Sequence, residues 1–213
     1  MKAELIDSMG SDLTAVNAAR VSFAKKKDVM DEKDERLIRY LASHKHWTPF
    51  SHIILQFRIT APIFVARQWY RHTVGFARNE ESRRYIRTEP SVFSPDSWRS
   101  APEGSIKQGS GGTHEASAAW KVEYNVHIKN SLDMYDRMIE DGVAPEQARM
   151  VLPQGTETSW VETASLYAYA RLCNERMQPD AQVEIRDLAE MVYNQCRDVA
   201  PVSWKYLAKG ETE

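Results

Sequence analysis

The chain has 213 residues, enough for one domain with its own hydrophobic core. Its formal net charge of −2 at pH 7 argues against a general nucleic-acid binder, which normally carries a basic excess. There is no apolar run of membrane-spanning length and no signal-peptide pattern at Met1, so we expect a cytoplasmic protein without a membrane partner.

The first half of the chain alternates between strand and helix patterns. Residues 3–7 (AELID) predict a short strand, and apolar residues at helical spacing predict a helix over about 34–43. Residues 53–60 (IILQFRIT) are rich in β-formers and predict a second strand. Pro62 then favours the start of a helix over 63–72, because proline needs no N–H partner there.

The second half is mostly helical. Residues 86–115 are rich in Pro, Ser and Gly and predict a long loop or insertion, followed by an amphipathic helix over about 115–141. Two more helices are expected at roughly 159–176 and 180–198, the second with Asp180 as its N-cap. We therefore predict one helix-rich α+β domain over the whole chain, with a small mixed or antiparallel sheet.

Cys173 and Cys196 lie within helical patterns and have no CxxC partner. We expect two buried free thiols, which suit a reducing compartment. The histidines have no metal-ligand spacing, and the sequence contains no phosphate-binding GxxxxGK[ST] or GxGxxG motif, so no metal site is expected.

The segment RHTVGFARNEESRRY, residues 71–85, holds four arginines and no lysine. Arginine presents a planar pair of donors that suits phosphate and carboxylate groups. Gln68, Arg71 and His72 are spaced i, i+3, i+4 and project from one helix face just before it. This composition leaves two alternatives open: an anion-binding loop, or a surface on which these arginines pair with the neighbouring glutamates.

A second basic group lies in RLCNERMQPDAQVEIR, residues 171–186. Arg171 and Arg176 stand near the expected end of a helix, where cations complement the helix dipole without any further role. Taken alone, this group is explained by the dipole.

The motif ITAPIFVARQWYRH followed by NEESRRY resembles the flavin-dependent thymidylate synthases, whose hallmark is RHR, about seven residues, then Ser. The resemblance extends over nearly the whole chain, and the 86–115 segment resembles a subgroup often found in bacteriophages. The other counterparts occur in the same order: NAARVSF (17–23), LIRYLASHKHWTPFSH (37–52), EQARMVLP (146–153) and NERMQPDAQVEIR (174–186).

The resemblance implies a homotetramer with active sites where subunits meet. It implies FAD as cofactor and methylation of dUMP at C5 to dTMP, with 5,10-methylenetetrahydrofolate as carbon donor and NADPH as reductant. No cysteine attacks the uracil in such enzymes. All partners would be small molecules or copies of the chain, not nucleic acid.

The resemblance also assigns roles to residues by position. Arg176 would be the catalytic residue, because its charge at the uracil edge stabilises the pyrimidine as an anion and makes C5 nucleophilic. Arg83 would act chiefly through its backbone. The expected nucleotide contacts are Gln68, Arg71, Glu80, Glu81, Ser82, Arg83, Arg84 and Arg176, and the expected FAD contacts are His46, Thr48, Arg71, His72, Thr73, Asn79, Glu80, Ser165 and Arg171.

The sequence departs from the family pattern at several positions. Thr73 replaces the third residue of RHR, and one extra residue precedes Ser82. Ser159 aligns with a phosphate-binding arginine of many relatives, so Arg87 or Arg171 is a candidate replacement. These departures keep open a different pyrimidine nucleotide, a hydroxymethyl product, or a nucleotide- or flavin-binding protein that has lost methylation. A purely structural helical protein ranks last, since it leaves the arginine-rich loop unexplained.

Overall fold

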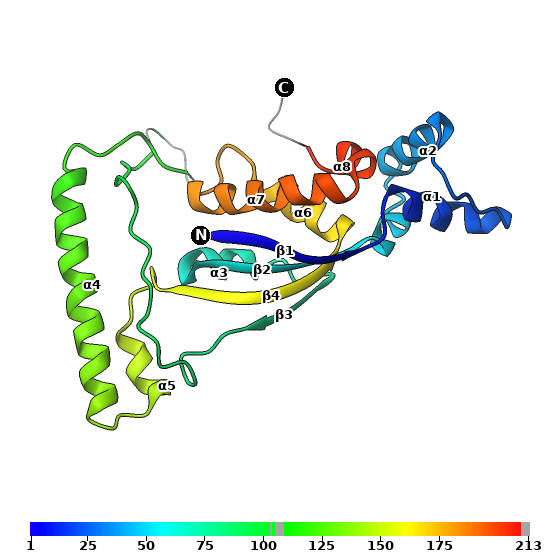
Figure 1. The fold of residues 1–213 in the computed structure, drawn as a ribbon. Coiled ribbons are helices and arrows are strands. Elements are labelled where there is room, and N and C mark those ends of the chain that lie inside the picture. The colour runs from blue at the N-terminus through cyan, green and yellow to red at the C-terminus, as the bar shows by residue number, and fades with distance from the viewer. Residues whose placement is uncertain (103, 105–108, 210–213) are drawn as a thin grey trace.

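The computed structural model describes residues 1–102, 104 and 109–209. A four-stranded antiparallel sheet lies at its centre, in the order β1-β2-β4-β3 (Figure 1). The strands are β1 (Lys2–Met9), β2 (Ile54–Pro62), β3 (Phe76–Glu80) and β4 (Glu157–Ser165). The predicted α+β class with a small antiparallel sheet is confirmed.

Strand β4 corrects the expectation of a helix starting at residue 159. Its residues alternate strictly between buried and half-buried, and Trp160, Glu162 and Ala164 lie on the buried side. Period-two burial is the property of a strand with one face on the core. The helix begins only at Leu166, so the first seven residues of the predicted helix are strand.

Three helices near the C-terminus pack together above the sheet in Figure 1: α6 (Leu166–Arg176), α7 (Val183–Val199) and α8 (Pro201–Leu207). The predicted N-cap Asp180 is wrong, because Gln182 precedes the first residue of α7. Both cysteines are fully buried in this layer.

The remaining N-terminal helices lie beside the sheet. They are α1 (Asp12–Arg20), α2 (Glu32–Ser43) and two 3₁₀ segments at Val21–Phe23 and Thr48–His52. The helix α3 (Ile63–Trp69) follows Pro62 and is shorter than the expected 63–72, since Tyr70 already forms its C-cap.

In Figure 1 the helix α4 (Ser117–Glu140) lies away from the layer of α6, α7 and α8. It is followed by α5 (Pro145–Ala148) and a 3₁₀ turn at Arg149–Val151. Only Ser131 and Tyr135 are buried among the 24 residues of α4. The expected loop over 86–115 contains no named helix or strand in its described part; positions 103 and 105–108 lie outside the described residues.

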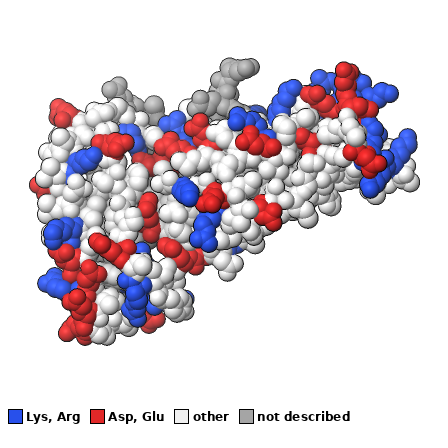
Figure 2. Space-filling view, viewed as in Figure 1, with Lys and Arg blue, Asp and Glu red and all other residues white. Residues whose placement is uncertain are grey.

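Figure 2 shows acidic and basic side chains interspersed over the visible face, in keeping with a net charge of −2. Among the described residues, no helix is both long enough and apolar enough to cross a membrane.

Candidate active site

The structure brings Arg176 onto two residues that precede it by more than one hundred positions. Arg176, at the end of α6, donates from Nε to His72 Nε2 at 2.8 Å and from Nη2 to the Gln68 carbonyl at 3.4 Å. Gln68 lies on α3, and His72 lies in the turn that follows it. We refer to Gln68, His72 and Arg176 as the Arg176 cluster.

The imidazole of His72 is held neutral in this cluster. Burial, together with the positive charge of Arg176, lowers its pKa from 6.5 to about 4. Neutral His72 can therefore accept the Arg176 hydrogen bond at Nε2 while Nδ1 carries the proton. Arg176 Nη1 makes no hydrogen bond with any residue in the described part of the chain, so it can donate to a ligand.

A buried carboxylate supports the turn that carries His72. Glu162 on β4 is fully buried and accepts hydrogen bonds from the indoles of Trp69 and Trp160. It also accepts from Arg78 Nε at 2.7 Å, and Arg78 Nη1 donates to the His72 carbonyl at 2.6 Å. Fixed donors around a buried charge satisfy it, so this network holds the turn in one conformation.

The motif residues 80–84 form a separate cradle. They line a cavity of about 330 Å³ together with Arg149, which sequence reasoning did not single out. The Arg83 side chain donates to the Thr88 carbonyl at 2.5 Å, and Glu80 accepts from Thr158 at 2.7 Å. The signal for Arg149 lies in EQARMVLP, a segment that has a counterpart in the family and contains one arginine.

The expected replacement arginines are not part of this cradle. Ser159 sits on β4, where its hydroxyl pairs with that of Thr60 at 2.8 Å. Arg87 and Arg171 are not among the residues that line the cradle cavity, whereas Arg149 is. The extra cation beside Ser82, Arg83 and Arg84 therefore comes from the 3₁₀ turn after α5.

Two of the expected flavin contacts line a third region. Ser165 and Arg171 line a cavity of about 850 Å³, with Gly75 and the exposed Val74 of the motif loop. Trp47 and Tyr167, which sequence reasoning missed, line the same cavity and stack with ring centroids 5.9 Å apart. Ser165 also caps α6, accepting from the Ala168 N–H at 3.2 Å.

The remaining expected contacts are surface residues. His46 and Thr48 are exposed on either side of Trp47, and Thr73 and Asn79 are exposed on the motif loop and β3. Arg71 is exposed too, and its side chain makes no hydrogen bond or ion pair with any residue the structure describes. These residues stand at the surface with their hydrogen-bonding groups open to a ligand or another subunit.

Neither cysteine can serve as a nucleophile in its present place. Cys173 and Cys196 are fully buried, and burial raises the pKa of both thiols. A buried thiol with a raised pKa is not ionised at neutral pH and does not attack a substrate.

Comparison with known proteins agrees with the motif. Residues 4–202 match the family model described as Thymidylate synthase complementing protein. The flavin-dependent thymidylate synthase of Thermosipho africanus is 36% identical over 96% of this chain and 90% of its own length, and that of Thermotoga neapolitana is 37% identical over 98% and 93%.

A solved structure shares the fold. The UMP/dUMP methylase PolB from Streptomyces cacaoi, bound with 5-Br dUMP, superposes with a TM-score of 0.86 at 32% identity, covering 96% of this chain and 93% of that one. The chain belongs to the flavin-dependent thymidylate synthase family, and the predicted family is confirmed.

Proposed function

We propose that this protein catalyses the reductive methylation of dUMP at C5 to give dTMP, with FAD as cofactor. 5,10-Methylenetetrahydrofolate supplies the carbon and NADPH is the reductant. The observation that carries the proposal is the Arg176 cluster, in which a guanidinium on α6 is oriented by neutral His72 and by the Gln68 carbonyl.

The cradle at residues 80–84 suits the phosphate of the nucleotide. Ser82, Arg84 and Arg149 supply a hydroxyl and two guanidinium groups around one cavity, and guanidinium groups bind phosphate with paired donors. Because the Arg83 side chain donates a hydrogen bond to the Thr88 carbonyl, Arg83 would contribute its backbone N–H to the phosphate instead. Glu80 and Glu81 line the same cavity and would meet hydroxyl donors of the ligand.

Arg176 is the proposed catalytic residue. C5 of uracil is a weak nucleophile until negative charge develops in the ring. A guanidinium held by His72 and Gln68 is preorganised to stabilise that charge, and the stabilisation is larger in the transition state than in the ground state. Gln68 near the end of α3 and Arg71 in the turn that follows it would contact the nucleotide or the cofactor.

The third region fits FAD. Its cavity of about 850 Å³ has two stacked aromatic rings for a flat ring system and the cation Arg171 for a phosphate. His46, Thr48, Thr73 and Asn79 add exposed polar groups near the same elements. When bound, FAD supplies the redox chemistry that converts the transferred carbon to a methyl group.

We further propose a homotetramer that acts in the cytoplasm, without nucleic-acid partners. Within the described part of one chain, the Arg176 cluster and the cradle share no lining residue and no hydrogen bond. The exposed Trp120, Val122 and Val126 on α4 offer apolar area for a subunit contact. A site assembled from two or more chains accounts for both observations.

The proposed reaction is tested by tritium release from 5-tritiated dUMP. The purified protein, supplied with FAD, NADPH and methylenetetrahydrofolate, should release tritium and form dTMP, and omitting any one of them should stop product formation. Parallel reactions with UMP and dCMP identify a different pyrimidine substrate, and mass spectrometry separates methyl from hydroxymethyl products. A protein that binds no flavin, by its absorbance band, under oxidising or reducing conditions would refute the proposed function.

A further inference from the structure

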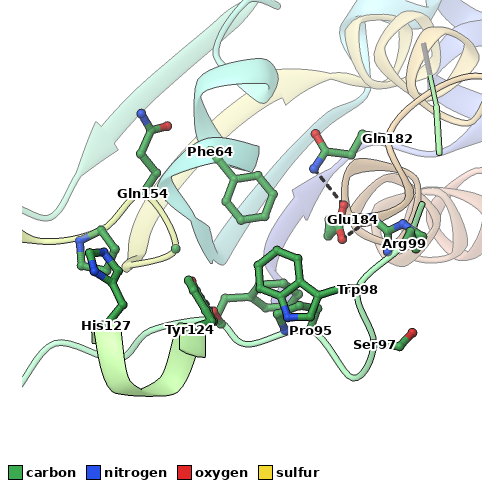
Figure 3. Close-up of a pocket in the computed structure, with 13 residues that line it drawn as sticks. Phe64, Pro95, Ser97, Trp98, Arg99, Tyr124, His127, Gln154, Gln182 and Glu184 are labelled. Atoms are coloured by element: carbon green, nitrogen blue, oxygen red, sulfur yellow. Dashed lines mark hydrogen bonds and ion pairs between the residues drawn. The ribbon is translucent and has the colours of Figure 1, made fainter. Parts of the chain in front are cut away.

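A chain of three hydrogen bonds connects the 86–115 segment to Gln68. Arg99 Nη2 donates to Glu184 Oε1 at 2.6 Å, and Gln182 Nε2 donates to Glu184 Oε2 at 2.8 Å. Gln68 Nε2 in turn donates to Gln182 Oε1 at 2.5 Å. Figure 3 shows Gln182, Glu184 and Arg99 joined along the wall of a cavity of about 400 Å³.

Arg99 and Glu184 are the two charged residues in this series of hydrogen bonds. Together they determine which side-chain group donates and which accepts in each of the three bonds. Arginine only donates, and ionised glutamate only accepts. The Glu184 side chain is 8% exposed and paired with Arg99. Although burial acts in the opposite sense, the hydrogen bond from Arg99 holds the pKa of Glu184 below its usual value, so the carboxylate is ionised at neutral pH.

Because Glu184 accepts, Gln182 must turn its NH₂ group toward it and its carbonyl oxygen toward Gln68. Gln68 must then turn its own NH₂ group toward Gln182, since two carbonyl oxygens repel each other. The carbonyl oxygen of the Gln68 side-chain amide therefore takes no part in this series of hydrogen bonds. It accepts no hydrogen bond from residues 1–102, 104 or 109–209, and it lies on the residue whose backbone carbonyl contacts Arg176.

We infer that Arg99, Glu184 and Gln182 are positioning residues that fix the amide of Gln68 so that its oxygen, not its nitrogen, is offered to the nucleotide. The inference rests on the proposed function. The site then selects a ligand with a hydrogen-bond donor at this point, either the N3–H of the pyrimidine or a hydroxyl of the sugar. Through Arg99, the loop before α4 also contributes to this specificity.

The variant Glu184→Gln should reverse donor and acceptor in the hydrogen bond between Gln182 and Gln68. The amide introduced at position 184 must give its oxygen to Arg99 and its NH₂ group to the Gln182 oxygen. Gln182 then offers its own NH₂ group to Gln68, whose NH₂ group is left to face the ligand. The double variant Gln182→Glu/Glu184→Gln restores the native direction, because the carboxylate introduced at position 182 accepts from both neighbours. The single and double variants are thus a matched pair that differ in the direction of the bonds.

The test measures dissociation constants of three probes by competition on the FAD-loaded protein: dUMP, dCMP, which lacks the N3 hydrogen, and 3′-O-methyl-dUMP, which lacks the 3′-hydroxyl hydrogen. In the native protein, the probe without the donor that Gln68 reads should bind about tenfold more weakly than dUMP. In Glu184→Gln the preference for dUMP over that probe should vanish or reverse. In the double variant the preference for dUMP should return. The probe that responds identifies the base or the sugar as the donor.

Flavin absorbance and melting temperature establish that each variant is folded. If Glu184→Gln does not fold, Gln182→Met breaks the chain with a side chain of similar size and should abolish the preference without reversing it. The inference is overturned if native protein and folded variant discriminate equally against both probes. Failure of the proposed function is visible separately, as native protein that neither binds nor turns over dUMP.

Discussion

At the scale of single residues, Arg176 carries the sharpest expectation. Arg176→Lys should keep the fold and flavin binding but lower kcat roughly a hundredfold, on the order of 3 kcal/mol of transition-state stabilisation. The lysine ammonium is a point charge on a flexible side chain. It cannot donate hydrogen bonds to His72 and Gln68 and at the same time present paired donors to the base. Steady-state kinetics and the melting temperature of the same variant measure the two effects. Activity within a few-fold of native would mean that Arg176 only complements the dipole of α6.

His72 gives a second residue-scale prediction, in stability. Its pKa is about 4 in the folded chain and 6.5 in the unfolded one, so between these values only the unfolded chain takes up the proton. The free energy of unfolding should therefore fall as pH decreases from 6.5 to 4, with about 2 kcal/mol attributable to His72 once solvent screening of this half-buried group is allowed for. Urea titrations across this range, compared with His72→Gln, isolate the contribution. Parallel curves for the two proteins would contradict the prediction.

The sequence predicted most residues of the candidate site, but not the residues that surround them and hold them in place. Gln68, His72 and Arg176 were named through the family resemblance, and the structure brings them into contact. Arg149 and Trp47 were missed because neither belongs to the arginine-rich motif, and only folding brings them beside it. Glu162 was missed because a buried carboxylate is recognisable only once its indole and guanidinium donors surround it.

At the scale of elements, Glu162 also explains why β4 was predicted as helix. A charged residue at a buried position conceals the alternation of Thr158, Trp160 and Ala164, which otherwise marks a strand. The short β3 was missed for a similar reason, since FARNE is polar and pairs along only one edge of the sheet. Strand β2 and helix α4 were predicted well, because apolar spacing dominates both.

The contact of α4 with the sheet end depends on one close approach. A Cβ atom on Gly155 would lie 2.3 Å from the Tyr124 hydroxyl of α4, which itself donates to the Phe93 carbonyl. Gly155→Ala should therefore lower the free energy of unfolding by about 1–3 kcal/mol through overpacking. Adding Tyr124→Phe removes the clashing oxygen, so the double variant should lose less than the sum of the two single losses.

Urea denaturation of the four proteins in this cycle measures the coupling. Additive losses would show that Tyr124 moves aside without strain, and the proposed close contact would then be unimportant for the position of α4.

At the scale of the whole molecule, we expect a tetramer with a sedimentation mass four times the 24.5 kDa of the chain. Trp120 on α4 is 55% exposed, so its large apolar ring is open to contact with another subunit. Trp120→Glu should lower the assembly state, because it places a charge where an apolar contact is expected. Native protein that sediments as a single chain at micromolar concentration would contradict the tetramer, and Trp120→Ser serves as the uncharged comparison.

The separation of the cradle from the Arg176 cluster within one chain has a genetic consequence as well as a chemical one. If each working site takes its cradle from one copy and its Arg176 from another, two defective alleles can complement each other. Co-expressed Arg84→Ala and Arg176→Lys chains, mixed at random, would yield roughly a quarter of their sites with both parts native. A cell that carries both alleles would then grow without added thymidine, although neither allele alone supports growth.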